Sequence, residues 1–279
     1  SVIFNHSGFA EVLPEDKYTI VKNLQWHNEI TGMTGDGVND APALKQAEVG
    51  IAVHSATDVA KQAASVILLK SGLESLINLI SVGRTTHHRI SNWVISKISK
   101  TLFTVLFVCL TYLITGEFVV SPFDMVMLLF IIDFVSLALS TDNVSWSKKP
   151  ETWNIKPMIK KGFVLGILLI VEAMVWLFAA KELFGLKNIN QPQSFGFSIL
   201  FFASVFNLII VRTDGYFYKQ KIGQILLRVL VADILLVYFL LTFGLIGFAS
   251  LPMITTISTI IYFAFCSFIV NDWAKVKVN

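Results

Sequence analysis

The sequence is poor in charged residues and in cysteine, and each shortage excludes certain classes of protein. Only 15% of its 279 residues are charged, against about a quarter in an ordinary soluble domain, while 54% are hydrophobic and the mean hydropathy is +0.68. A single soluble globule is therefore not expected. The net charge of +3 is too small to indicate nucleic-acid binding. Cys109 and Cys266 both lie in apolar runs, which excludes a disulfide framework and a zinc site.

The sequence also lacks the features of a secretory leader. It begins Ser1-Val2-Ile3-Phe4, without an initiator methionine, a basic segment or a cleavage site. We therefore interpret it as part of a longer protein. Residues 1–100 hold equal numbers of basic and acidic side chains, and the whole positive excess falls among the long apolar runs that follow. This pattern predicts a soluble segment over residues 1–91 and a membrane segment over residues 92–279.

Six apolar stretches are each long enough, at roughly 20 residues, to cross a bilayer as a helix. We expect the spans near residues 93–115, 121–141, 162–184, 194–212, 225–247 and 250–271. Basic residues gather in the loops on one side, namely Lys148, Lys149, Lys156, Lys160, Lys161, Arg212, Lys219, Lys221, Arg228, Lys275 and Lys277. The loops on the other side carry only Lys181 and Lys187. Because basic loops stay in the cytoplasm, both termini of this chain are expected to be cytoplasmic.

Charged side chains inside such spans are costly and usually functional. Asp133 stands in the middle of the second span, and we expect apolar neighbours to bury it; these are Phe130, Ile131, Ile132 and Phe134. Ser136 follows at helical spacing on the same face. Lys97 and Lys100 of the first span either extend toward the cytoplasmic interface or act as internal counter-charges.

Two further acidic residues fall within the predicted spans. Glu172 lies in the middle of the third span, and Asp233 lies in the cytoplasmic half of the fifth. For both we expect structural pairing, or a protonated and hydrogen-bonded state, rather than ion transport.

The soluble segment alternates between strand-like and helix-like patterns. We expect strands at residues 30–34, 49–53 and 65–69, and helices at residues 19–25, 41–47 and 58–64. Such alternation is typical of an α/β fold with a parallel, doubly wound sheet. The acidic loop at residues 35–40 follows the first strand, and sheets of this kind bind ligands at the carboxyl ends of their strands.

The residue types in this loop suit a phosphate and a hard cation. Gly35 and Gly37 allow the backbone to turn sharply and to approach a ligand closely. Asp36 and Asp40, with Asn39 between them, suit Mg²⁺ bound together with phosphate oxygens. On spacing alone the signal is weak, because Asp-Gly-x-Asn-Asp also forms ordinary turns.

The longer string Thr34–Leu44, TGDGVNDAPAL, resembles the signature of P-type ATPases, which are ion pumps that pass through an aspartyl-phosphate. Pro14-Glu15-Asp16-Lys17 is similar to the family segment that carries an essential lysine, and the six predicted spans are similar to the family's fifth to tenth membrane helices. The resemblance implies part of a phosphorylation domain with the fold of haloacid dehalogenases (HAD-like), followed by an all-α bundle of six transmembrane helices.

The resemblance also implies roles for particular residues, with ATP as substrate and Mg²⁺ as cofactor. Lys17 would stabilise the phosphoryl charge, and Asp36 would ligate Mg²⁺. Asp40 would either ligate the ion or support its ligands, and Asn39 would complete the phosphate surroundings. The glycines on either side of Asp36 would line the phosphate site.

Within the family, two stretches are most similar to the plasma-membrane proton pumps: Gly8–Val12, and Ser121–Trp153 with Asp133 inside it. The likeness implies that Asp133 carries the proton and that the protein lies in the plasma membrane. Two positions depart from the subfamily pattern. Ile132 stands where an asparagine usually precedes the aspartate, and Phe103 stands where plant members have a basic residue.

The Asp-Lys-Thr-Gly-Thr motif, whose aspartate is phosphorylated in the family, is absent from these residues. We therefore expect this chain to be inactive alone and to need an N-terminal part of the same pump. Three alternatives remain open: a P-type pump for Ca²⁺, Na⁺/K⁺ or Mg²⁺, a non-catalytic membrane subunit or remnant of such a pump, and an autonomous phosphatase. An autonomous phosphatase would have no use for six spans.

Overall fold

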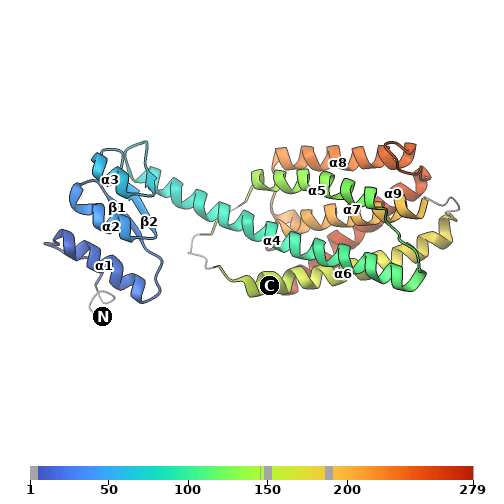
Figure 1. Ribbon diagram of the computed structural model, residues 1–279, viewed down its shortest axis with the longest axis horizontal. Helices are drawn as coiled ribbons and strands as arrows, with labels where there is room; N and C mark the ends of the chain where they lie inside the picture. Colours follow the sequence, from blue (N-terminus) through green and yellow to red (C-terminus); the bar gives the residue numbers. More distant parts are fainter. Residues whose placement is uncertain (1–5, 145, 148–152, 186–190, 279) are drawn as a thin grey trace. The chain divides into compact units, whose positions relative to one another are not determined.

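The computed structural model describes residues 6–144, 146–147, 153–185 and 191–278. The chain divides into two compact units, Ser1–Gly83 and Arg84–Asn279. The strands belong to the first unit, and the second is built from long helices (Figure 1).

The first unit contains a three-stranded parallel sheet in the order β1-β2-β3. The strands are β1 (Gly32–Gly35), β2 (Val49–Ala52) and β3 (Val66–Ile67), and three α-helices and a 3-10 turn accompany them: α1 (Pro14–Trp26), η2 (Val38–Asp40), α2 (Ala41–Gln46) and α3 (Asp58–Ala63). In the register of the sheet, Thr34 pairs with Ile51, and Ile51 pairs with Val66. The predicted α/β fold with a parallel sheet is confirmed.

Small side chains build the core of this unit. Its main cluster consists of Leu44, Ala52, Ala56 and Ala60. Helix α2 lies so close to β2 that a Cβ atom on Gly50 would stand 2.2 Å from the carbonyl oxygen of Leu44, so only glycine fits there. The close packing of α2 fixes the loop that precedes it.

The second unit consists mainly of α-helices. They are α4 (Leu73–Thr115, which begins in the first unit), α5 (Pro122–Ala138), α6 (Ile155–Phe184), α7 (Gln191–Val211), α8 (Gln224–Phe243), α9 (Met253–Phe265) and α10 (Asp272–Val278), with the 3-10 turns η3 (Leu139–Thr141) and η4 (Phe217–Lys219) and the π-helical segment η5 (Cys266–Asn271). Among the described residues, six helical segments are long and apolar enough to cross a membrane. The predicted six-helix bundle is confirmed.

Helix α7 forms the centre of the bundle. Every residue from Ser194 to Val211 is buried, and the helix packs against α5, α6, α8 and α9. A helix that is apolar on all sides is expected in such an interior position. The outer helices differ, because large apolar side chains on α4, α5 and α8 are exposed; Leu113 and Leu137 are 77% and 70% exposed.

Two helices differ in length from the prediction. Helix α6 begins at Ile155 rather than near residue 162, with the side chain of Asn154 accepting a hydrogen bond from the backbone of Lys156 at 3.3 Å. The last helical segment extends past residue 271, the predicted end of the sixth span, and continues through η5 and α10 to Val278. Lys275 and Asp272 form a buried ion pair of 2.6 Å there, which lets two charged residues continue the helix. Of the basic residues used for orientation, Lys148, Lys149 and Lys187 lie outside the described residues.

Candidate functional site

Asp40 is the central side chain of the acidic loop and is 5% exposed. Its Oδ1 accepts a hydrogen bond from Lys17 Nζ at 2.6 Å, and its Oδ2 accepts from the backbone N–H groups of Asp36 and Gly37 at 3.1 and 3.3 Å. Burial acts to raise the pKa of this carboxyl, but the bonds from Lys17 and the two backbone groups lower it more, so the net shift is downward. Asp40 is therefore an ionised group whose two oxygens are already engaged.

Gly35 allows this arrangement at the end of β1. A Cβ atom at that position would lie 2.5 Å from Asp40 Cβ, so any other residue would push the carboxylate away. The loop is also tied to the start of α3, because the backbone N–H of Thr57 donates to the Asp36 carbonyl at 2.8 Å. Helices α1, α2 and α3 thus position one short loop.

Asp36 and Asn39 have different surroundings from Asp40. Both are exposed, and neither side chain forms a hydrogen bond or an ion pair with another described residue. A hollow of about 270 Å³ lies at the carboxyl ends of the strands, lined by Thr34, by Val53–Ser55 after β2 and by Leu68 and Lys70–Gly72 after β3, together with Leu76. The predicted ligand edge of the sheet is therefore open.

The donor set in the loop fits magnesium bound together with phosphate. Mg²⁺ takes one or two protein carboxylates and completes its octahedron with water and phosphate oxygens. Asp36 offers a free carboxylate, whereas the oxygens of Asp40 are held by Lys17 and the loop backbone. Within the described residues there is no group of three or more His, Cys, Asp or Glu side chains that could hold a metal by itself.

Glu48 forms hydrogen bonds at the opposite end of the sheet that were not predicted from the sequence. Its Oε2 accepts from the backbone N–H and the hydroxyl of Thr31 at 2.8 and 2.6 Å, and its Oε1 accepts from Gln25 Nε2 at 2.7 Å. These bonds, with that from the Thr31 hydroxyl the strongest, lower the pKa of Glu48 to about 2. The contact joins α1 to the residues before β1 and β2, on the side of the sheet away from the acidic loop.

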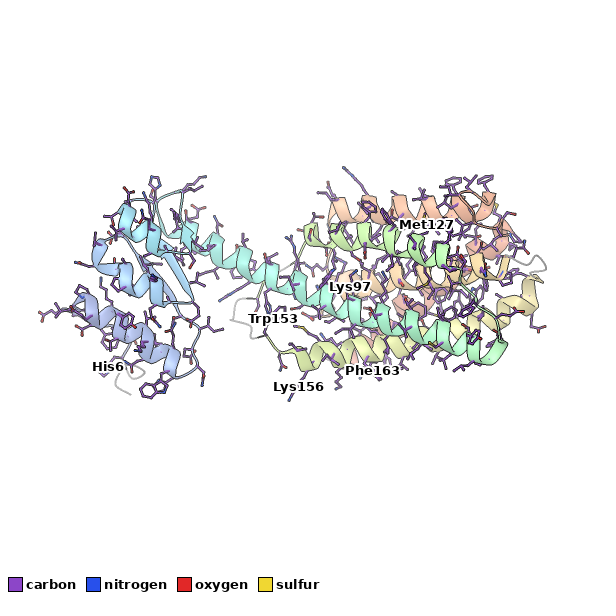
Figure 2. The ribbon with its side chains drawn as sticks, in the orientation of Figure 1. His6, Lys97, Met127, Trp153, Lys156 and Phe163 are labelled. Atoms are coloured by element: carbon purple, nitrogen blue, oxygen red, sulfur yellow. The ribbon has the colours of Figure 1, made fainter. Side chains whose placement is uncertain are left out.

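The second predicted site brings both lysines of α4 to Asp133 of α5. Lys97 Nζ lies 2.7 Å from Asp133 Oδ1, and Lys100 Nζ lies 4.0 Å from the same oxygen. Lys97 is labelled on α4 in Figure 2. Of the two interpretations left open for the lysines, the contact favours internal counter-charges over extension toward the interface.

The surroundings of Asp133 differ from the expectation of burial. Its side chain is 52% exposed, and Phe130 and Phe134 are exposed as well, whereas Ile131 and Ile132 are buried. The reason is the orientation of α5, whose buried face packs into the bundle through Ile131, Ile132 and Val135. Asp133 instead lines a shallow hollow of about 240 Å³ on the outer face of α5.

Ser136 does not join this group. It is half-buried and lines a separate hollow of about 360 Å³, together with Arg89 and Trp93 of α4. Among the described residues, no hydrogen bond connects it to Asp133. The structure therefore unites Lys97, Lys100 and Asp133 but leaves out the serine.

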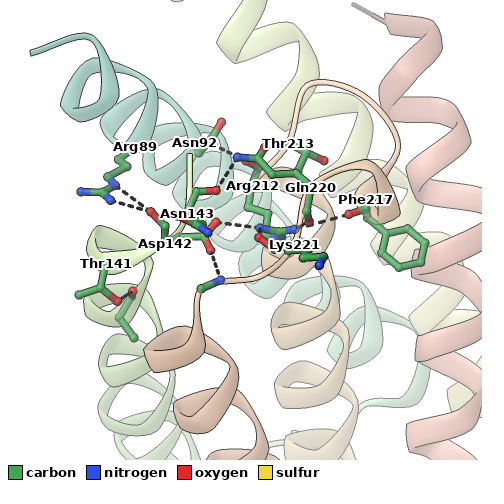
Figure 3. Close-up of polar contacts among 12 residues, drawn as sticks. Arg89, Asn92, Thr141, Asp142, Asn143, Arg212, Thr213, Phe217, Gln220 and Lys221 are labelled. Carbon is green, nitrogen blue, oxygen red and sulfur yellow. Dashed lines mark hydrogen bonds and ion pairs between the residues drawn. The ribbon is translucent and has the colours of Figure 1, made fainter. Parts of the chain in front are cut away.

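A buried ion pair at one end of the bundle was not predicted (Figure 3). Arg212, after α7, lies 3.0 Å from Asp142, after η3, and both side chains are fully buried. The second oxygen of Asp142 accepts from the backbone of Gly223 at 2.8 Å. Arg212 also donates to backbone carbonyls in the loop between α7 and α8, namely those of Phe217, Gln220 and Lys221.

Helix α4 attaches to this ion pair through two side chains (Figure 3). Arg89 donates to the Asp142 carbonyl at 2.6 and 3.2 Å, and Asn92 donates to the Arg212 carbonyl at 2.8 Å. The pair therefore joins α4, the end of α5 and the loop after α7. Arg212 and Asp142 are far apart in the sequence, so the pair could not be predicted. From the sequence alone, an arginine at the end of an apolar run indicates only a basic residue in a loop.

Comparison with known proteins finds a family model that matches most of the first unit. Residues 16–80 match the model of the haloacid dehalogenase-like hydrolases. This unit is a HAD-like domain. The matched residues include Lys17 and the whole acidic loop.

A longer match extends into the helical bundle. The chain is 36% identical over 219 residues to a protein of Methanocaldococcus jannaschii described as "Putative cation-transporting ATPase". The match covers 78% of this chain and 27% of that protein, so the chain spans about a quarter of the length of this relative. The two matches together support the resemblance to P-type ATPases.

Proposed function

We propose that this chain is part of a P-type ATPase that uses Mg-ATP to export a cation. The observation that carries the proposal is the loop after β1, where Asp40 is held by Lys17 while the Asp36 carboxylate is left exposed. The same chain continues from this HAD-like domain into six candidate membrane spans. A HAD-like domain joined to a membrane bundle in one chain supports an ATP-driven ion pump.

In this proposal the loop acts by positioning and by neutralising charge, which dominate phosphoryl transfer. Asp36 would bind Mg²⁺, and Lys17 would face the transferring phosphoryl group. Asp40 would hold the Lys17 ammonium group and the loop backbone in place, since both of its oxygens are engaged. Asn39, whose side chain is exposed, would donate to a phosphate oxygen.

The rest of the pump lies outside this sequence in our proposal. That part would carry the phosphorylated aspartate, the nucleotide-binding domain, the dephosphorylating loop and four further helices. The protein would lie in the plasma membrane, with both ends of this chain in the cytoplasm as the loop charges predict. A non-catalytic subunit or remnant would lack the Asp-Lys-Thr-Gly-Thr motif in the sequence that precedes this chain, so reading that sequence separates the two possibilities.

We further propose that the cation is a proton and that Asp133 carries it. A metal cation needs several oxygen ligands, and Ca²⁺ takes six to eight. Asp133 instead has two ammonium groups at 2.7 and 4.0 Å. Two lysines beside a single carboxylate repel a metal cation, whereas a proton needs only a carboxylate whose contact with Lys97 differs between two states. Pumps for Ca²⁺, Na⁺/K⁺ or Mg²⁺ remain the competing assignments.

Transport in reconstituted vesicles tests both proposals together. The full-length protein is sealed into vesicles with a pH-sensitive dye, in choline buffer that contains Mg²⁺ but no other alkaline-earth ion and no alkali ion. ATP is expected to acidify the lumen, and Asp133→Asn is expected to abolish the acidification. Exposed Asp58→Asn, in the first unit, is the matched control and should retain it. An absolute requirement for an added metal ion would overturn the proton assignment.

A further inference from the structure

Apart from the sites above, a group of buried oxygen atoms within the bundle lacks hydrogen-bond donors. Glu172 of α6 is 8% exposed, and Ser267 and Asn271 of η5 are fully buried. One carboxylate oxygen of Glu172, Oε2, accepts from Asn271 Nδ2 at 3.0 Å. Glu172 Oε1, Asn271 Oδ1 and Ser267 Oγ have no hydrogen-bond partner in the described part of the chain.

Asn207 of α7 carries another buried oxygen without a donor. It is 1% exposed, and its Nδ2 donates to Ser99 Oγ at 2.8 Å, which leaves Asn207 Oδ1 without a donor. In both Asn207 and Asn271, the side-chain amide nitrogen donates a hydrogen bond, whereas the side-chain carbonyl oxygen accepts none from the described residues.

Asn207 and Asn271 lie at about the same level of the bundle. Lys275 Nζ donates to the Ile210 carbonyl at 2.7 Å, and α7 packs against η5. The ring of Phe206 contacts that of Phe268 at 5.6 Å, so the two helices run in the same direction. Asn271 lies one helical turn before Lys275, and Asn207 lies about one turn before Ile210.

The charge of Glu172 is not balanced by any basic residue that the structure describes. Lys275, on the next turn of the same helix as Asn271, is already paired with Asp272 at 2.6 Å. A buried carboxylate without a counter-charge is strongly unfavourable, and buried carbonyl oxygens without donors add to the cost. A positively charged ligand would satisfy the four oxygens. Because the group contains one carboxylate, a single positive charge would balance it.

The local backbone is consistent with a binding site. Residues Cys266–Asn271 are π-helical, and single π-helical turns within α-helices are frequent at functional sites. Ser267 and Asn271 are four residues apart, so they project from one face of this segment. Tyr262, one turn before the segment, donates its hydroxyl to the Glu172 carbonyl at 3.1 Å, which holds α6 against α9.

We propose that these oxygens bind one resident monovalent cation of the alkali class, Na⁺ or K⁺, with Glu172, Ser267, Asn271 and Asn207 as ligands. Carboxylate, amide and hydroxyl oxygens are the ligands that hard cations prefer. A proton on Glu172 would remove the charge but would supply only one donor for the remaining oxygens. The cation joins α6, α7 and η5 and is distinct from the transported ion, so it does not depend on the proposed pump activity.

Direct binding to the intact protein in detergent tests the site. The protein is equilibrated in choline buffer and then exposed to ²²Na⁺ or ⁸⁶Rb⁺. One cation is expected to bind to each chain. Glu172→Gln, which keeps the shape and removes the charge, should weaken binding roughly tenfold or more, the effect of losing a charged partner. Exposed Glu182→Gln, on the same helix, is the matched control and should bind as the unchanged protein does.

Thermal unfolding provides a second readout. NaCl or KCl should raise the unfolding temperature of the unchanged protein above its value in choline chloride at equal ionic strength, because a ligand of the native state stabilises it. This increase should persist in Asp133→Asn, which separates the resident cation from the transported one, and should be lost in Glu172→Gln. If Glu172→Gln does not fold, Ser267→Ala serves instead and should weaken binding by a smaller factor.

Three results would overturn the site. The first is a wild-type protein that binds neither ion. The second is an unfolding temperature that responds to pH alone, which would assign a proton to Glu172. The third is binding that persists in Glu172→Gln but disappears in Asp133→Asn, which would place the cation in the transport site.

Discussion

The two units hold their charged side chains in opposite ways. In the first unit, the side chain of Lys17 is 38% exposed where it meets Asp40, and Asp36 is exposed with no partner among the described residues. In the second, the Arg212–Asp142 pair is fully buried, and the side chains of Lys275 and Asp272 are 3% and 1% exposed. Exposed charges remain available to a ligand, whereas buried pairs bind helices to one another.

Two ion pairs of the second unit depart from this pattern: in the Lys161–Asp214 pair the Asp214 side chain is 62% exposed, and the other is the Lys97–Asp133 pair. Its side chains are 32% and 52% exposed, so it resembles the Lys17–Asp40 pair more than its buried neighbours. The comparison therefore separates the charged groups by exposure. The Lys17–Asp40 and Lys97–Asp133 pairs are partly exposed in this chain, whereas the pairs made by Arg212 and Lys275 are buried.

The largest effect on stability is expected from breaking the buried pair. Arg212→Met leaves Asp142 buried without its cation, which typically costs about 3–5 kcal/mol. The measurement is the free energy of unfolding in mild detergent. Lys219→Met, in the same loop and with its ammonium group over the Tyr216 ring, is the control and should change stability far less. The double variant Arg212→Met with Asp142→Leu should recover much of the loss; if it does not, the pair is not what joins the helices.

The next effect concerns the exposed pair and should appear in activity rather than in stability. Lys17→Ala in the full-length pump should slow phosphorylation by about 10²–10³, the usual cost of one electrostatic contact to a transition state. Nucleotide affinity should change little, because in our proposal the lysine acts on the phosphoryl group rather than on the base. Both quantities are measured in one preparation. Weakened ATP binding with a normal phosphorylation rate would contradict the role given to Lys17.

The sequence predicts those parts of the fold that depend on residues close together in the chain. The strands near residues 30–34 and 49–53 were predicted within two residues of β1 and β2, because apolar runs and glycines mark them. The third strand, predicted over five residues, keeps only Val66 and Ile67, which pair with Ile51 and Ala52 of β2. The six spans were found for the same local reason, their length and apolar composition.

Contacts between distant residues could not be predicted. Nothing near Asp133 in the sequence identifies Lys97 as its partner, and Asp142 and Arg212 follow different spans. Asp133 was expected to be buried because its neighbours are apolar, but the orientation of α5 decides which of them face the core. The role that we propose for the acidic loop rests on its motif, whereas the separate roles proposed for Asp36 and Asp40 rest on the hydrogen bonds of Asp40.

The smallest predicted effect is a pH dependence in the first unit. Glu48 has an ordinary pKa of 4.5 that is lowered to about 2 in the folded chain, so its contribution to stability is complete above pH 4.5 and is lost as the pH falls toward about 2. Thr31→Val removes the hydroxyl that donates to Glu48 and should flatten the stability profile in this range. Thr19→Val, whose hydroxyl donates to a helix carbonyl, is the control. If Thr31→Val has the same dependence of stability on pH as the unchanged protein, Glu48 does not contribute to stability in the way described.

The central claim is that the acidic loop performs magnesium-dependent phosphoryl chemistry for the pump. The most direct test is ATP hydrolysis by the purified full-length protein and its Asp36→Asn variant, with membrane insertion checked in both. We predict that Asp36→Asn inserts normally and abolishes Mg²⁺-dependent hydrolysis, because Asp36 offers the free carboxylate of the loop. Normal Mg²⁺-dependent hydrolysis by Asp36→Asn would contradict the claim.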